Sequence, residues 1–106
     1  MQRQYAVAAV GVALLAGFFF MGRQSASNVY TEATTKMNSS MSGSHTGDAD
    51  IDFAMMMIPH HQGAIDMAKI ELQSGQDFEM REMAEKIIQD QTKEIAALES
   101  WLQKKR

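Results

Sequence analysis

Methionine and histidine are the side chains in this sequence with the clearest capacity for chemistry. Methionine occurs 10 times and cysteine not at all. Two methionine–histidine pairs, each four residues apart, are expected on neighbouring stripes of one helix: Met56 with His60, and Met57 with His61. Thioether sulfur selects Cu(I), and imidazole binds copper in either oxidation state. The segment therefore predicts a copper site, with Cu(I) as the favoured form.

Two further residues of this segment affect how the pairs can be used. Gly63 falls on the same stripe as Met56 and His60, so it leaves space for a ligand or for the close approach of another helix. Pro59 removes a backbone donor from the helix, and we expect a kink or break just before the histidines. The angular position of Met56 relative to the histidines depends on that kink.

Other chemistries have weaker support. The absence of cysteine excludes disulfides and thiolate sites. Di-iron bundles use Glu-x-x-His, whereas Met57 stands three residues before His60. A general acid–base role for the histidines needs an orienting carboxylate, and only Asp52 and Asp66 are near in sequence. A net charge of -3 argues against nucleic-acid binding. We therefore expect a protein that is not an enzyme.

Packing is the alternative explanation for a stripe of methionines at helical spacing. We apply it to Met80 and Met83, which occur among isoleucine and alanine residues, and expect them in the core. The three consecutive methionines 55–57 cannot all face one site, so at least one of them must pack. Two adjacent histidines beside two methionines shift the balance toward metal binding.

The elements that must position these residues are two helices. The periodicity predicts helices over about 51–73 and 78–103, with Asp48 or Asp50 as the first N-cap and Asp77 as the second. We expect the first helix to end at Ser74–Gly75, with the glycine in a left-handed cap. No strand-like alternation appears, so the predicted fold class is all-α. The short link makes the helices an antiparallel αα-hairpin.

A hairpin of this size buries little apolar surface by itself. We therefore expect two hairpins to pair into a four-helix bundle, most simply as a homodimer. A larger membrane complex could provide the same cover.

The residues before the hairpin predict two further zones. The apolar run 5–22, between Arg3 and Arg23, is just long enough to cross a bilayer. We therefore interpret residues 1–23 as an uncleaved transmembrane anchor rather than as a cleaved export signal. Either interpretation places the hairpin domain, 48–106, outside the cytoplasm, on the periplasmic or cell-surface side. The segment 24–47 reads as a flexible linker. Its Met37, Met41 and His45 are most simply incidental, with a weak capture arm for metal as the other option.

The chain resembles a known family, the bacterial domain of unknown function 305 family. The resemblance covers about half of the chain, and its most specific part is Met57–Ala68, MIPHHQGAIDMA. Further matching positions are Phe53, 79–81, 84–88, Gln91, Glu94–Ile95 and Trp101–Leu102. The family is grouped with ferritin-like helical bundles, and its members look exported or membrane-tethered. Some are reported to bind copper and to contribute to copper tolerance or trafficking.

The resemblance also implies a set of metal ligands. The shared methionine and histidine positions correspond to Met57, His60, His61 and Met67, with Met56 as the substitute if the kink rotates the site. Because this chain has one hairpin, the resemblance favours a site completed across a dimer.

The leading functional prediction is a membrane-tethered, extracytoplasmic protein that buffers or transfers copper. The alternative is a non-catalytic docking or assembly subunit of a membrane complex.

Overall fold

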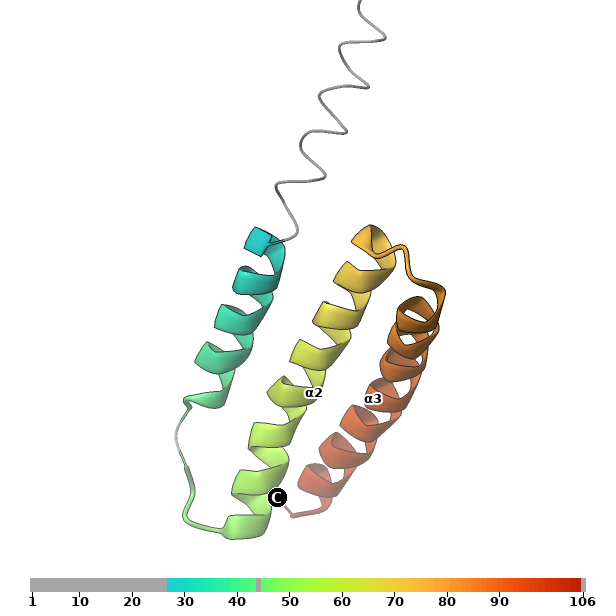
Figure 1. The fold of residues 1–106 in the computed structure, drawn as a ribbon. Coiled ribbons are helices and arrows are strands. Elements are labelled where there is room, and N and C mark those ends of the chain that lie inside the picture. The colour runs from blue at the N-terminus through green and yellow to red at the C-terminus, as the bar shows by residue number, and fades with distance from the viewer. Residues whose placement is uncertain (1–26, 44, 106) are drawn as a thin grey trace, which may run out of the picture.

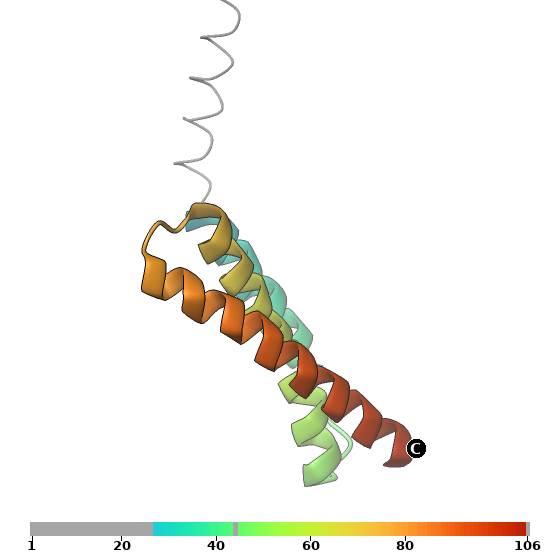
Figure 2. The same ribbon diagram turned by 90° about the vertical axis from the view of Figure 1, so that its right-hand side faces the viewer.

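Three helices lie side by side in the computed structural model, which describes residues 27–43 and 45–105. They are a helix over 27–41, called here the N-terminal helix, α2 (Ala49–Ser74) and α3 (Phe78–Lys105). Neighbouring helices are antiparallel, and α2 lies between the other two (Figure 1). The view from the side shows α3 crossing in front of α2, with the N-terminal helix behind (Figure 2). The predicted all-α class is confirmed, and no strand occurs among the described residues.

The predicted transmembrane segment, 5–22, lies outside the described residues. No helix of the part that is described has the length and apolar character needed to cross a membrane.

The start of α2 confirms one of the two predicted N-caps. The Asp48 carboxylate accepts hydrogen bonds from the backbone amides of Asp50 and Ile51, at 3.0 and 3.2 Å. Such a bond satisfies amides that have no partner within the helix. The helix then continues through Pro59 without interruption, so of the predicted kink or break the break is wrong, and the kink stays a prediction. Proline costs the helix one backbone bond, and the turns on both sides remain helical.

The end of α2 differs from the prediction in its cap. Gly75 ends the helix as predicted, but its backbone is extended, with φ −76° and ψ 151°, rather than left-handed. The left-handed cap is unnecessary because Arg81 of α3 donates to the carbonyls of Leu72 and Gly75, at 2.7 and 3.0 Å. Asp77 caps α3 as predicted, accepting from the Met80 amide at 3.0 Å.

The core between the helices is made mainly of small residues. The buried apolar residues include Ala33 of the N-terminal helix, four residues of α2 and Ala84 of α3; those of α2 are Ala54, Ile65, Ala68 and Ile70. No described side chain is completely enclosed. The prediction that Met80 and Met83 pack in the core is wrong, because they are 45% and 54% exposed. They line an open groove on one side of the three-helix layer, together with Tyr30 and Met67.

The N-terminal helix corrects the prediction that 24–47 is a flexible linker, because 27–41 are helical. The hydroxyls that suggested a linker, on Thr31, Thr34 and Ser40, each donate to the carbonyl four residues earlier at 2.9 Å. They are thus satisfied inside the helix. Its buried or half-buried positions recur every four residues, at Val29, Ala33, Met37 and Met41. Packing on this stripe stabilises a segment whose composition alone favours coil.

Met37 seats the N-terminal helix on α2. A Cβ atom placed on Gly63 would lie only 2.5 Å from the Met37 Sδ and 2.8 Å from its Cγ. Gly63 therefore serves close helix approach, one of the two uses predicted for it. Lys36 and Asp66 add an ion pair across the same boundary at 3.8 Å, with the lysine largely exposed.

The turn from the N-terminal helix to α2 is fixed by Asp52. Its Oδ1 accepts from the amide and hydroxyl of Thr46, both at 2.7 Å, and its Oδ2 accepts from the Gly47 amide at 3.0 Å. The bonds from Thr46 lower the pKa of the Asp52 carboxyl, because they favour its charged form. Gly47 has φ +88°, a conformation that side-chain-bearing residues rarely adopt.

Candidate metal centre

The two adjacent histidines lie in opposite environments. His61 is only 9% exposed and points to α3, where its Nε2 is hydrogen-bonded to the Glu94 carboxylate. His60 is exposed. The two ring centroids are 6.2 Å apart and the ring planes are inclined by 62°. Consecutive helix residues are about 100° apart around the axis, so one histidine faces the α2–α3 interface and the other faces solvent.

One nitrogen of His61 has no partner. Nδ1 is buried and makes no hydrogen bond to any described residue. In a neutral ring whose Nε2–H donates to Glu94, Nδ1 carries a lone pair and acts as an acceptor. Buried polar atoms are nearly always satisfied, so this atom calls for an explanation. A metal ion on Nδ1 would supply one, because metal-binding histidines usually donate their other ring N–H to a carboxylate.

Met57 is the predicted ligand that accompanies His61. It precedes His61 by one helical turn and is half-buried. Side chains four residues apart lie on the same face of a helix, so Met57 and His61 share the side of α2 that turns toward α3. This pair is the part of the predicted ligand set that the helix geometry keeps together.

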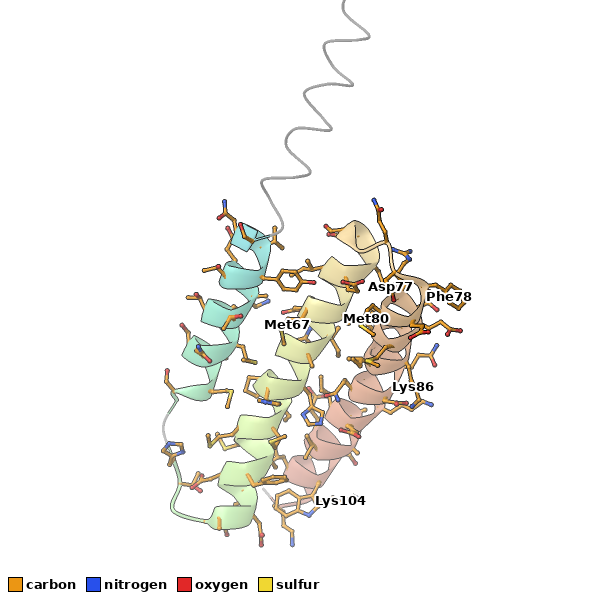
Figure 3. All side chains as sticks on the ribbon, viewed as in Figure 1. Met67, Asp77, Phe78, Met80, Lys86 and Lys104 are labelled. Carbon is orange, nitrogen blue, oxygen red and sulfur yellow. The ribbon has the colours of Figure 1, made fainter. Side chains whose placement is uncertain are left out.

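Met67 lies elsewhere along the same helix. It is ten residues beyond Met57, roughly 15 Å at the rise of an α-helix. Met67 lines a groove of about 250 Å³ together with Tyr30, Met80 and Met83. In Figure 3, Met67 of α2 and Met80 of α3 lie at a similar height, toward the end of the molecule where these two helices are connected.

Met56 lies in the half of α2 opposite to that of Met67. It lines a small pocket with Met41 and His45, which belong to the segment predicted as linker. The five predicted ligands are therefore divided among several places: Met57 and His61 together, His60 in solvent beside them, Met67 in the groove and Met56 in the small pocket. Their role as ligands stays a prediction.

Carboxylate-based metal binding has no support in the described part of the chain. Within 27–43 and 45–105, no three histidine, aspartate or glutamate side chains gather where they could hold a metal ion. Magnesium, calcium and di-iron centres need such oxygen-rich groups. Thioethers and imidazoles occur together along α2 and in the lining of the small pocket, and these donors suit softer ions.

Glu94 is the residue of the candidate site that the sequence alone does not single out. It precedes Ile95 of the apolar stripe of α3, and 58% of its side chain is exposed. A carboxylate at the edge of an apolar stripe, opposite a histidine on the neighbouring helix, could have suggested the pair. The register between α2 and α3 was needed to place the two side by side.

Comparison with known proteins gives one result on family membership. No curated protein matches the chain. The model of a family described as "Domain of unknown function (DUF305)" matches residues 21–105, so the match includes the N-terminal helix as well as α2 and α3. The match covers most of the sequence and agrees with the resemblance carried by the MIPHHQGAIDMA segment, and the chain therefore belongs to the DUF305 family.

Proposed function

We propose that this protein is a membrane-tethered, extracytoplasmic copper-binding protein that buffers Cu(I) or Cu(II), or hands it to a partner. The observation that carries the proposal is the unpartnered, buried Nδ1 of His61, whose Nε2 is held by Glu94. The Glu94 carboxylate orients the ring and strengthens the free nitrogen as a ligand. The proposed anchor is the apolar run 5–22.

The proposed ligands near this nitrogen are Met57 and His61, with His60 as a further donor after a side-chain rotation. One thioether and one imidazole leave copper under-coordinated, so a chain by itself offers an incomplete set. A second copy of the chain could supply the remaining donors to the ion that each chain holds. Copper held this way could pass to a partner by ligand exchange, which requires no catalytic group.

The uncovered side of the three-helix layer supports pairing with a second copy. Three exposed apolar side chains, Tyr30, Met80 and Met83, line one open groove with Met67, whereas the exposed Phe53 and Phe78 lie outside that groove. Exposed apolar side chains gathered in one groove are typical of an interaction surface. Packing the α2 and α3 hairpins of two copies face to face would give the four-helix, ferritin-like bundle that the sequence suggests, with the N-terminal helices outside it.

An anaerobic Cu(I) competition titration against a chromogenic chelator tests the proposal, using the full chain in detergent micelles. His61→Gln and Met57→Leu should each lower the Cu(I) affinity by at least about tenfold, with helicity retained in circular dichroism. Met83→Leu makes the same substitution as Met57→Leu, but at an exposed methionine. It should leave the Cu(I) affinity of the Met57 and His61 site unchanged. Equal affinity of wild type and His61→Gln would reject His61 as a ligand.

The second candidate function is a docking or assembly subunit of a membrane complex. The exposed aromatic residues Phe53 and Phe78, at 62% and 73% exposure, favour it. In that case the full chain should bind Cu(I) no more tightly than the His61→Gln variant does. Phe53→Ser and Phe78→Ser should then change association, measured by size-exclusion chromatography with light scattering.

A further inference from the structure

The turn between the N-terminal helix and α2 encloses a second group of soft donors. A pocket there, called here the turn pocket, has three methionines, a histidine and an aspartate in its lining together with Ser40 and Gly43: Met41, His45, Asp52, Met55 and Met56. Its donors come from three separate pieces of chain: the end of the N-terminal helix, the turn and the first half of α2. Neither Met57 nor His61 lines this pocket.

The size of the turn pocket restricts what can occupy it. Its volume is about 40 Å³. Pockets for organic ligands measure roughly 300–1,000 Å³, whereas a single water needs about 10–15 Å³. The turn pocket is therefore of a size for one ion rather than for a metabolite.

The chemistry of the lining favours a soft ion. Both carboxylate oxygens of Asp52 already accept hydrogen bonds from Thr46 and Gly47, so the aspartate is engaged in holding the turn. Ser40 also lines the pocket, and its hydroxyl donates to the Lys36 carbonyl. The other donors are three thioethers and one imidazole, the set that Cu(I) prefers over hard cations. Negative charge in the first turn of α2, from Asp50 and Asp52, offsets the unfavourable effect of the helix dipole on a cation.

The turn is also held in place before any ion arrives. The three hydrogen bonds to Asp52 fix the residues that follow His45, and the Asp48 cap fixes the start of α2. At the other side, Met37 in the space left by Gly63 fixes the helix that carries Met41. A preorganised set of donors pays less ordering entropy on binding than a flexible arm would.

We propose that the turn pocket is a second Cu(I) site, with Met41, Met56 and His45 as its ligands and Met55 as a further thioether at its edge. The inference shares the choice of ion with the proposed function but uses different residues. Met41 and His45, which the sequence alone explains most simply as incidental residues of a linker, thus become part of the metal-binding apparatus. With the His61 site, each chain would hold two ions.

The test is an anaerobic titration of the full chain with Cu(I) alone, in detergent micelles, with ¹³C-methyl-labelled methionine followed by NMR. In the wild type we expect two equivalents of Cu(I), with shifts of the Met41 and Met56 methyl signals and of the His45 ring signals. The double variant Met41→Leu/Met56→Leu keeps the apolar volume and removes two thioethers. It should lose one equivalent and keep its helicity.

The matched control is Met80→Leu/Met83→Leu, the same double change on the exposed side of α3. Leucine keeps the apolar volume that the proposed pairing surface needs, so this variant should still take up two equivalents. The turn pocket is rejected if Met41→Leu/Met56→Leu also takes up two equivalents of Cu(I). It is likewise rejected if the methyl signals of Met41 and Met56 do not move when the wild type is titrated. A wild type that binds one ion, lost in His61→Gln and kept in Met41→Leu/Met56→Leu, rejects the turn pocket and leaves the proposed function standing. A wild type that binds one ion, kept in His61→Gln and lost in Met41→Leu/Met56→Leu, supports the turn pocket and rejects His61 as a copper ligand.

Discussion

The central helix α2 meets a neighbour on each side, and the two interfaces are built differently. Toward α3 it uses small buried residues, the His61–Glu94 pair and the bonds of Arg81 to the carbonyls at its end. Toward the N-terminal helix it uses the fit of Met37 to Gly63 and a largely exposed ion pair between Lys36 and Asp66. Exposed ion pairs contribute about 0–1 kcal/mol. The α2–α3 hairpin is therefore the firmer unit, and the N-terminal helix is the part that can detach.

The largest effect should come from a charge placed inside the firmer interface. Ala84 is 3% exposed and is the buried residue of α3. Ala84→Glu buries an unpaired carboxylate and should lower the free energy of unfolding by about 3–5 kcal/mol. Chemical denaturation followed by circular dichroism measures it. Ala97→Glu, the same change at an exposed position of α3, should stay within about 0.5 kcal/mol of the wild type. Equal losses in both variants would mean that α3 does not pack on α2 through Ala84.

Crowding the other interface should have a smaller and more local effect. Gly63→Val places atoms where Met37 lies and should cost about 1–3 kcal/mol. Hydrogen exchange should show faster exchange over 27–41, with the amides of α3 still protected. Adding Met37→Ala should restore part of the loss. Gly43→Val is the control, because nothing lies within 4 Å of a Cβ at that position. Uniform loss of protection over all three helices would contradict a detachable N-terminal helix.

Removing the carboxylate partner of His61 should separate metal binding from stability. Because Glu94 is more than half exposed, Glu94→Ala should cost only about 1 kcal/mol of stability. The Cu(I) affinity should fall about 10–100-fold, as for other carboxylates that orient a metal-binding histidine. A Cu(I) competition titration beside thermal unfolding measures both. Glu85→Ala removes an exposed carboxylate from the same helix and should change neither. An unchanged affinity in Glu94→Ala would assign the His61–Glu94 pair to packing alone.

The smallest effect concerns acid and the turn at the N-terminal interface. The bonds from Thr46 lower the pKa of Asp52 below its ordinary value of 3.8. The charged carboxylate therefore contributes stability above that value, and the contribution is lost as the pH falls through the lowered pKa. The amide signals of Thr46 and Gly47 should titrate in NMR with a midpoint below 3.8. Thr46→Val removes the hydroxyl donor and should raise that midpoint. A wild-type midpoint at or above the ordinary pKa would show that Asp52 does not accept these hydrogen bonds in solution.

The contrast between the interfaces also explains what could be predicted from the sequence. The apolar periodicity of 51–73 and 78–103, and the caps at Asp48 and Asp77, report local preferences, so the hairpin was predictable to within about two residues. The N-terminal helix was not, because its serines and threonines favour coil locally and its stability comes from α2 through Gly63. Gly75 was assigned the wrong cap for a similar reason, since Arg81 arrives from another helix.

The candidate site follows the same division. The Met57 and His61 pair was predictable because both residues belong to one helix and stand one turn apart. The partner of His61, Glu94, and the grouping of Met56 with Met41 and His45 depend on how separate segments align. The division of Met67 from Met57 follows from helix rise, which angular periodicity alone does not take into account.

The helix over 27–41 changes the mechanical relation between the domain and whatever precedes it. A flexible linker lets a domain wander through a wide volume, whereas fifteen helical residues form a rigid spacer roughly 22 Å long. The chain enters at the end of the layer where α2 and α3 are joined, and the turn that carries His45 lies at the far end (Figure 1). The turn pocket therefore lies the length of this helix beyond residue 27, at the far end of the layer. A partner that delivers an ion to that pocket would have to reach the far end of the layer.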